Sequence, residues 1–233
     1  MQDKKGDLIG KPSGWLVCLL LLLPSYFINN GTSHDWGGDF AMYISQAENI
    51  VAGILQADTG YIYNTECPGV GPPTYPVGFP LLLSPVIALF GNDMEVLIDF
   101  MAIVFILFGV MVFLFLRSGS GFLLALFGAL TLAYHPALLV FKREVMSDVP
   151  FVLFALLSIY LAAKKKWGWA GLLMALCASI RTVGVSLILA SVILMVLDVF
   201  KANKTNHNGS IFKGICIAVV GNFIINHRFN TPS

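Results

Sequence analysis

The sequence predicts an all-α polytopic membrane protein with about seven transmembrane helices and additional interfacial helices in the first outer loop. Of the 233 residues, 57% are hydrophobic and 12% are charged, whereas soluble domains are about 45–50% apolar and about 25% charged. The mean hydropathy is +0.81. The apolar residues form near-continuous runs of roughly 14 to 21 residues. Runs of this length are typical of membrane helices, because the strands of outer-membrane barrels show alternating segments of about ten residues.

The charge balance excludes two other classes of protein. Fourteen basic residues stand against 13 acidic ones, which gives a net charge of +1. A nucleic-acid-binding protein would carry a basic stripe or patch, so we expect no nucleic-acid partner. A disordered chain would combine low hydrophobicity with high net charge, and this sequence has neither property.

The first predicted span covers residues 14–29. Lys4, Lys5 and Lys11 precede this apolar stretch, as in a signal peptide. No cleavage site with small residues follows, because residues 24–27 continue the stretch. We therefore expect an uncleaved first span with a cytoplasmic N-terminus.

The short apolar run at 79–91 decides the topology. Its 13 residues would cover only about 20 Å as a helix, against a hydrocarbon thickness of about 30 Å. We expect this run to lie in the outer interface. The remaining predicted spans are 96–116, 121–140, 149–163, 167–180, 183–200 and 211–226.

The distribution of Lys and Arg gives an independent test of this arrangement. Cytoplasmic loops carry an excess of basic residues. If 79–91 stays outside, ten basic residues lie inside and four lie outside. If 79–91 crosses the membrane, the split becomes seven to seven, which provides no orienting signal. The charges therefore favour seven spans with the C-terminus outside.

Most acidic residues then lie on or near the outer face, where we expect the chemistry. These residues are Asp35, Asp39, Glu48, Asp58, Glu66, Asp93, Glu95, Asp99, Glu144 and Asp148. The chain is predicted to be a single membrane domain over 1–233, with an outer loop over 30–95. A long loop between helices is usually functional.

Two interfacial helices are predicted in this outer loop, at about 40–55 and at 79–91. In the first, apolar residues recur at helical spacing, and the intervening Ser45, Gln46, Glu48 and Asn49 are assigned to a polar face. Asp39 directly precedes this helix. Its role could be limited to that of an N-cap.

Five short segments, in this order and spacing, resemble the GT-C superfamily of membrane glycosyltransferases, in particular the protein O-mannosyltransferase and lipid A aminoarabinose transferase branch. The segments are the first span, Gly38–Ile44 leading the first interfacial helix, Tyr75–Leu83, Met146–Phe151 opening a span, and Ala178–Arg181 between two spans.

The resemblance implies a transferase that passes a sugar from a polyprenyl-phosphate carrier to a lipid, glycan or protein hydroxyl. It implies Asp39 as the catalytic base and places Asp148 in the same site. Arg181 and Arg143 match positions that hold the carrier phosphate. Tyr43 and Tyr75 are expected to line the substrate site, although both could be interface anchors.

Several of these residues have a simpler structural interpretation. Asp148 could cap the helix that begins near Pro150. Arg181 could mark a turn at the lipid headgroups. Lys142 and Arg143 could form a local ion pair with Glu144.

The sequence also raises the question of a metal. His34, Asp35 and Asp39 match no known ligand spacing, so no metal ligand is assigned. Some members of the superfamily use a divalent cation, and this cofactor stays open.

The chain departs from the family in two ways. Several members carry a lysine in or beside the Tyr-Pro motif, whereas residues 74–77 contain no cation. Members usually have more spans and a further outer domain, so the chain is expected to be a reduced relative or an N-terminal part that could be inactive alone.

Two other functions compete with the transferase. A transporter would need ionisable groups at mid-membrane depth, and the long runs 96–116 and 121–140 carry none except Asp99 near one end. A non-catalytic lipid-binding assembly subunit would differ only in its lack of activity. The expected location is a bacterial inner membrane, with the donor and membrane lipid as partners. The sugar, the acceptor and the oligomeric state stay open.

Overall fold

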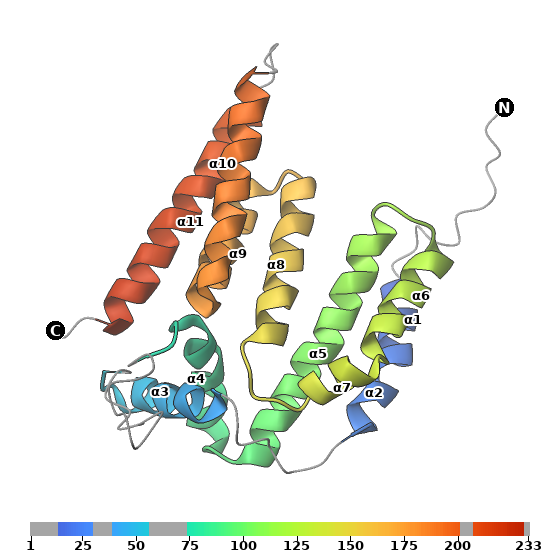
Figure 1. Cartoon of the computed structure of the whole chain (residues 1–233), viewed down its shortest axis with the longest axis vertical. Coiled ribbons are helices and arrows are strands. Elements are labelled where there is room, and N and C mark those ends of the chain that lie inside the picture. Colours follow the sequence, from blue (N-terminus) through green and yellow to red (C-terminus); the bar gives the residue numbers. More distant parts are fainter. Residues whose placement is uncertain (1–13, 30–38, 56–73, 201–206, 231–233) are drawn as a thin grey trace.

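A computed structural model describes residues 14–29, 39–55, 74–200 and 207–230 (Figure 1). Every regular element within these ranges is a helix, in agreement with the all-α prediction. The elements are α1 (Gly14–Leu22), α2 (Pro24–Phe27), α3 (Phe40–Ala52), α4 (Gly78–Phe90), α5 (Met94–Arg117), α6 (Phe122–Ala133), α7 (Pro136–Phe141), α8 (Asp148–Ala163), α9 (Trp167–Ile180), the 3₁₀ turn η1 (Thr182–Gly184), α10 (Val185–Phe200) and α11 (His207–Asn230).

The longer helices run alternately between two ends of the molecule. Figure 1 shows the α5–α6 and α8–α9 connections at the upper end, and the α4–α5, α7–α8 and α9–α10 connections at the lower end. Both α3 and α4 lie at this lower end, and they pack against each other. This end, which we call the α3–α4 end, therefore contains the segments that the sequence assigns to the outer side of a membrane.

Two of the predicted spans are each broken into two helices by a proline. The span 14–29 divides at Leu23, because Pro24 opens α2. The span 121–140 divides between α6 and α7, where His135 is extended and Pro136 opens α7. Proline lacks a backbone N–H and disfavours the helical conformation in the residue before it.

Among the described residues, α5 alone is both long and apolar enough to cross a membrane by itself. It has 24 residues, and an 18-residue stretch within it has a mean hydropathy of 2.8. The other apolar helices have 10–17 residues. A 16-residue helix such as α8 reaches about 24 Å. The predicted helices are thus present, and the number of spans stays a prediction.

The polar face predicted for α3 is partly wrong. Gln46 is fully buried and Asn49 is nearly so, whereas Val51 and Ile54 are exposed. The Gln46 amide is buried because it bonds to backbone groups of Tyr75. Contacts within the protein, and not the periodicity of α3 alone, therefore determine which side of this helix faces inward.

Lys142 joins the α7–α8 loop to the end of α2. Its side chain is 1% exposed, and Nζ donates hydrogen bonds to the carbonyl oxygens of Ser25 (2.9 Å), Tyr26 (2.8 Å) and Ile28. These carbonyls lie at a helix C-terminus, where a cation is favourable. Burial lowers the pKa of Lys142, and the neighbouring Arg143 acts in the same direction. Lys142 thus caps a helix. From the sequence, only a local ion pair with Glu144 was expected for this residue.

Lys142→Met is expected to lower the free energy of unfolding by about 1–3 kcal/mol, because it leaves buried carbonyl groups without their donor. The measurement is thermal unfolding in detergent, with Lys213→Met as the control because Lys213 is exposed on α11. Equal unfolding temperatures for the two variants would contradict the capping role.

Candidate active site

The carboxylate of Asp39 accepts a hydrogen bond from the hydroxyl of Tyr75, with 2.6 Å between Oδ1 and the phenol oxygen. Asp39 occupies the N-cap position of α3, but its side chain makes no capping hydrogen bond and its backbone is helical (φ −79°, ψ 0°). Capping therefore does not explain this aspartate. The structure instead joins two predicted site residues that are 36 positions apart in the chain.

Tyr43 lies beside this pair. Its ring centroid is 4.9 Å from that of Tyr75 and 5.0 Å from that of Phe79. Its hydroxyl lies 3.1 Å from the Ser147 hydroxyl, at the start of α8. The pair with Tyr75 is tilted and the pair with Phe79 is edge-to-face, and aromatic contacts of this kind hold side chains in defined orientations.

The environment of Tyr43 shows which charges surround it. Burial raises the pKa of the Tyr43 phenol above its ordinary value, and the negative charges of Asp39 and Asp148 act in the same direction. The Ser147 hydrogen bond and the positive charge of Arg181 oppose this shift. Both aspartates and the arginine thus lie close enough to Tyr43 to interact with it electrostatically.

Asp148 and Arg181 form an ion pair between the N-terminus of α8 and the C-terminus of α9. Asp148 stands in the first turn of α8, and Arg181 is an extended residue directly after α9. The Asp148 side chain is 41% exposed and that of Arg181 is 39% exposed. Ion pairs this exposed contribute about 0–1 kcal/mol to stability, so a stabilising role is a weak explanation for the pair.

Arg143 points toward the first predicted span. Its guanidinium donates a hydrogen bond to Oδ1 of Asn29 over 3.2 Å, close to the carbonyls that Lys142 caps. The structure thus connects Arg143 to the end of α2, whereas Arg181 stands with Asp148.

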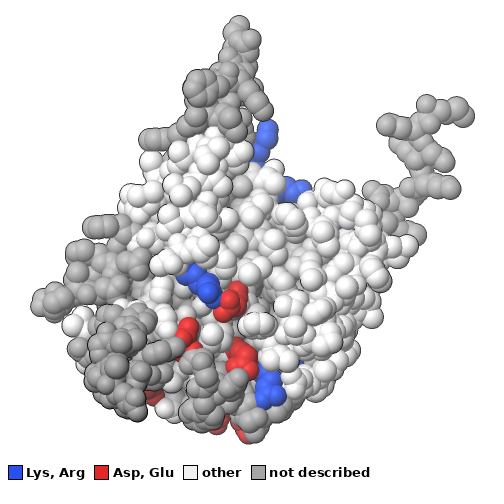
Figure 2. All heavy atoms as spheres, in the orientation of Figure 1, with Lys and Arg blue, Asp and Glu red and all other residues white. Residues whose placement is uncertain are grey.

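Charged side chains gather at the α3–α4 end. Figure 2 shows acidic and basic side chains together on the lower part of this face, below a broad surface that is uncharged apart from basic side chains near the top. A surface divided in this way suits a protein whose charged end lies in water and whose sides contact lipid.

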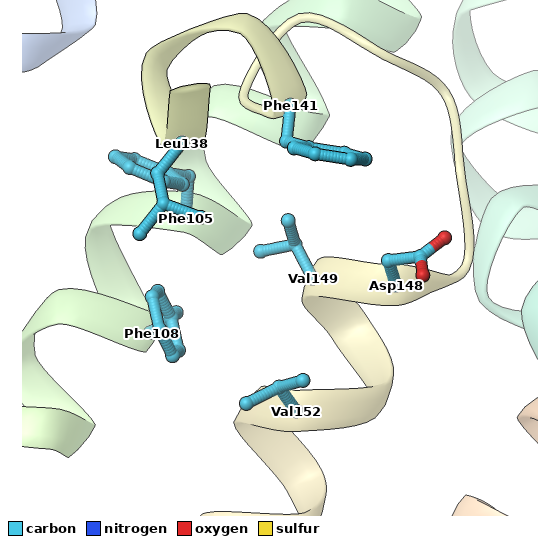
Figure 3. A pocket seen from close by; sticks show the side chains of 7 residues that line it. All are labelled: Phe105, Phe108, Leu138, Phe141, Asp148, Val149 and Val152. Carbon is cyan, nitrogen blue, oxygen red and sulfur yellow. The ribbon is translucent and has the colours of Figure 1, made fainter. Parts of the chain in front are cut away.

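Two apolar cavities flank the first turns of α8. One has a volume of about 210 Å³ and lies between α5, α7 and α8. Figure 3 shows Asp148 at its edge, with the carboxylate directed away from Phe105 and Phe108 on the other side. The second has a volume of about 560 Å³, lies between α4, α5 and α8, and is lined by apolar residues only.

Gln46 and Ser147 contact the predicted site residues, but neither was singled out from the sequence as a site residue. Gln46 bonds to the backbone of Tyr75 through both ends of its amide. Its position three residues after Tyr43 and seven after Asp39, on one side of a helix, was an available signal. Ser147 contacts Tyr43, but its pairing with a residue 104 positions away cannot be read from spacing.

Within the described ranges, no group of three or more His, Cys, Asp or Glu side chains could hold a metal ion. His34 and Asp35, which raised the question of a metal in the sequence, lie outside the described residues.

One protein family matches the chain. The family described as dolichyl-phosphate-mannose-protein mannosyltransferase matches residues 74–224, which is about two thirds of the sequence. The match includes Tyr75, Asp148 and Arg181, and Asp39 lies before it. No curated protein and no solved structure is significantly similar to the chain.

Proposed function

Because the chain belongs to the dolichyl-phosphate-mannose-protein mannosyltransferase family, a family of GT-C glycosyltransferases that use polyprenyl-phosphate sugars, we propose that it transfers a sugar from such a carrier to a hydroxyl group on the outer face of a membrane. The observation that carries this proposal is the cluster of Asp39, Tyr75, Tyr43, Asp148 and Arg181 at the α3–α4 end, next to two apolar cavities.

Asp39 is the general base in this proposal. The acceptor hydroxyl attacks the anomeric carbon of the sugar, the bond from that carbon to the phosphate oxygen breaks, and the hydroxyl proton passes to the carboxylate. A positioned base contributes about 10²- to 10⁴-fold to such a step. The Tyr75 hydroxyl occupies Oδ1 of Asp39, and Oδ2 is the atom that we assign to the proton.

Arg181 binds the phosphate of the carrier, whose negative charge grows as the sugar departs. A guanidinium presents a planar fork of N–H groups that can bind two phosphate oxygens together. Asp148 contacts one side of this fork through Nη1, so it orients the arginine. We therefore assign Asp148 to the site through its action on Arg181.

The apolar cavities suit the polyprenyl tail. The larger one lies between α4, α5 and α8, and Pro150, Leu153 and Phe154 of α8 line it. Asp148 stands at the start of the same helix. If the phosphate of the carrier binds Arg181, the polyprenyl tail attached to it would therefore enter this cavity and its apolar surroundings.

Family membership favours the transferase over the transporter. The assembly subunit differs from an enzyme only in activity, so activity is the test. Membranes containing the full chain are incubated with radiolabelled dolichyl- or undecaprenyl-phosphate sugars, and the label is followed into lipid, glycan and protein fractions. Transfer that depends on the chain and on Asp39 supports the proposal, and absence of transfer from every donor contradicts it.

The topology leads to a separate prediction. If α4 stays on the outer side and α5 crosses, the loop after α4 lies outside and the loop after α5 lies inside. Cysteines introduced at Asn92 and Ser118, both exposed, are expected to react with an impermeant maleimide from opposite sides, Asn92 from the outside and Ser118 from the inside. Reaction of Asn92 from the inside and Ser118 from the outside would mean that α4 crosses the membrane, and reaction of both from the same side would mean that α5 does not cross.

A further inference from the structure

We propose that Tyr75 is a positioning residue, which holds the carboxylate of Asp39 in the orientation needed to accept a proton. This inference rests on the proposed function, because it gives Tyr75 a task only if Asp39 is the base. It differs from the substrate-lining role expected from the sequence, since the tyrosine acts here through the aspartate and not on the sugar.

The carboxylate of Asp39 has no capping bond to hold it. The side chain has two rotatable bonds, and a base that turns away from its substrate loses rate. The 2.6 Å bond from the Tyr75 hydroxyl is short, as expected for a hydroxyl that donates to a charged oxygen. The bond therefore restrains the carboxylate.

Tyr75 is itself held by a matched pair of hydrogen bonds. Gln46 Nε2 donates to the Tyr75 carbonyl over 3.1 Å, and the Tyr75 N–H donates to Gln46 Oε1 over 3.2 Å. Gln46 is fully buried in α3, the helix that Asp39 precedes. A fully buried amide that is satisfied by one backbone residue is a specific constraint. It ties the tyrosine to the helix that carries the base.

Two further contacts limit the movement of the tyrosine. Its ring packs on Tyr43, and Gly78, three residues later, lies directly on the backbone of α9. A Cβ atom at Gly78 would lie 2.5–2.7 Å from backbone atoms of Ser179 and Ile180. These two residues precede Arg181. The segment Tyr75–Gly78 thus contacts the base at one end and the helix terminus that carries the phosphate-binding arginine at the other.

The chain contains a similar pair away from this cluster. The Tyr26 hydroxyl donates to Asp99 Oδ1 over 2.7 Å, and both residues belong to other helices, α2 and α5. This pair has the same chemistry and nearly the same length. It provides a matched control for the loss of a tyrosine-to-aspartate hydrogen bond.

The test measures kcat, and KM for the donor, in the full chain. Tyr75→Phe keeps the ring and its packing on Tyr43 but removes the hydroxyl. We expect kcat to fall by about 10- to 100-fold, because small displacements of a reacting group cost up to about 10²-fold. The KM for the donor is expected to stay within about twofold, since Arg181 is unchanged. Tyr26→Phe is expected to change neither constant.

A double-mutant cycle then tests whether Gln46 acts through the tyrosine. Gln46→Leu alone is expected to lower kcat. In the Tyr75→Phe background, the same change is expected to lower kcat by less than about twofold, because the hydroxyl that Gln46 positions is already absent. An equal loss in both backgrounds would contradict the positioning role of Gln46. If Gln46→Leu does not fold, Tyr75→Phe and its Tyr26→Phe control still decide the proposal.

The outcomes separate this inference from the proposed function. If Asp39→Asn is inactive and Tyr75→Phe has the wild-type kcat, the positioning role is wrong and the transferase proposal stands. An increase in KM with unchanged kcat would assign Tyr75 to donor binding and overturn the inference. If Asp39→Asn is as active as the wild type, the proposed base itself is wrong.

Discussion

Asp39→Asn is expected to abolish sugar transfer while the protein still folds and inserts. Asparagine is nearly isosteric with aspartate and can accept the Tyr75 hydroxyl bond, but its neutral amide cannot take a proton from the acceptor. The loss of a general base corresponds to about 10²- to 10⁴-fold in kcat. The measurement is the rate of label transfer from a radiolabelled polyprenyl-phosphate sugar, normalised to the amount of folded protein.

Asp99→Asn is the matched control. Asp99 is also a carboxylate that accepts a tyrosine hydroxyl, from Tyr26, and we place it outside the catalytic machinery. We expect wild-type transfer from the Asp99→Asn control. We expect an unchanged unfolding temperature for Asp39→Asn, because the Asp39 side chain makes no capping bond. Wild-type transfer by Asp39→Asn would refute its role as the base.

Arg181→Lys is expected to weaken donor affinity by roughly 10- to 150-fold. Lysine can keep the ion pair with Asp148 and can equally reach the headgroup region. It cannot present two parallel donors to a phosphate, because its charge is a single point. The lost charge-assisted hydrogen bond corresponds to about 1.5–3 kcal/mol. The measurement is transfer as a function of donor concentration.

Arg143→Lys serves as the comparison for this prediction. The guanidinium of Arg143 bonds to Asn29 at the end of α2, so we expect a smaller change in donor dependence there. If Arg181→Lys leaves the donor dependence unchanged, Arg181 is an anchor. A large effect at Arg143 would then move the phosphate site toward α2.

The helices could be predicted because each depends on a local pattern. The predicted helix 79–91 corresponds to α4 at Gly78–Phe90, and the run 96–116 corresponds to α5 at Met94–Arg117. Gly91, at φ +77°, ends α4 where the predicted run ends. The breaks before Pro24 and Pro136 were also visible in the sequence. The predicted spans run through both prolines because their boundaries follow the continuous hydrophobicity and not the local effect of proline.

The burial of α3 could not be predicted in the same way. A helical pattern assigns polar residues to the solvent side. Gln46 departs from this rule because the backbone of Tyr75 provides two hydrogen-bond partners for its side chain. Lys142 is similar, since its buried position depends on three carbonyl groups more than 110 residues earlier. In both cases a distant partner offsets the cost of burying a polar group.

The sequence by itself determined the helical class, the position of most helices and the candidate residues Asp39, Asp148 and Arg181. Local periodicity and composition suffice for the helices, and a resemblance in short motifs supplied the residues. Only the tertiary structure decided that Asp39 meets Tyr75, that Asp148 meets Arg181 and that Arg143 turns toward Asn29. The reason is that such contacts depend on how helices pack, and close approaches such as Gly78 on the backbone of Ser179 bring together groups that no local pattern relates.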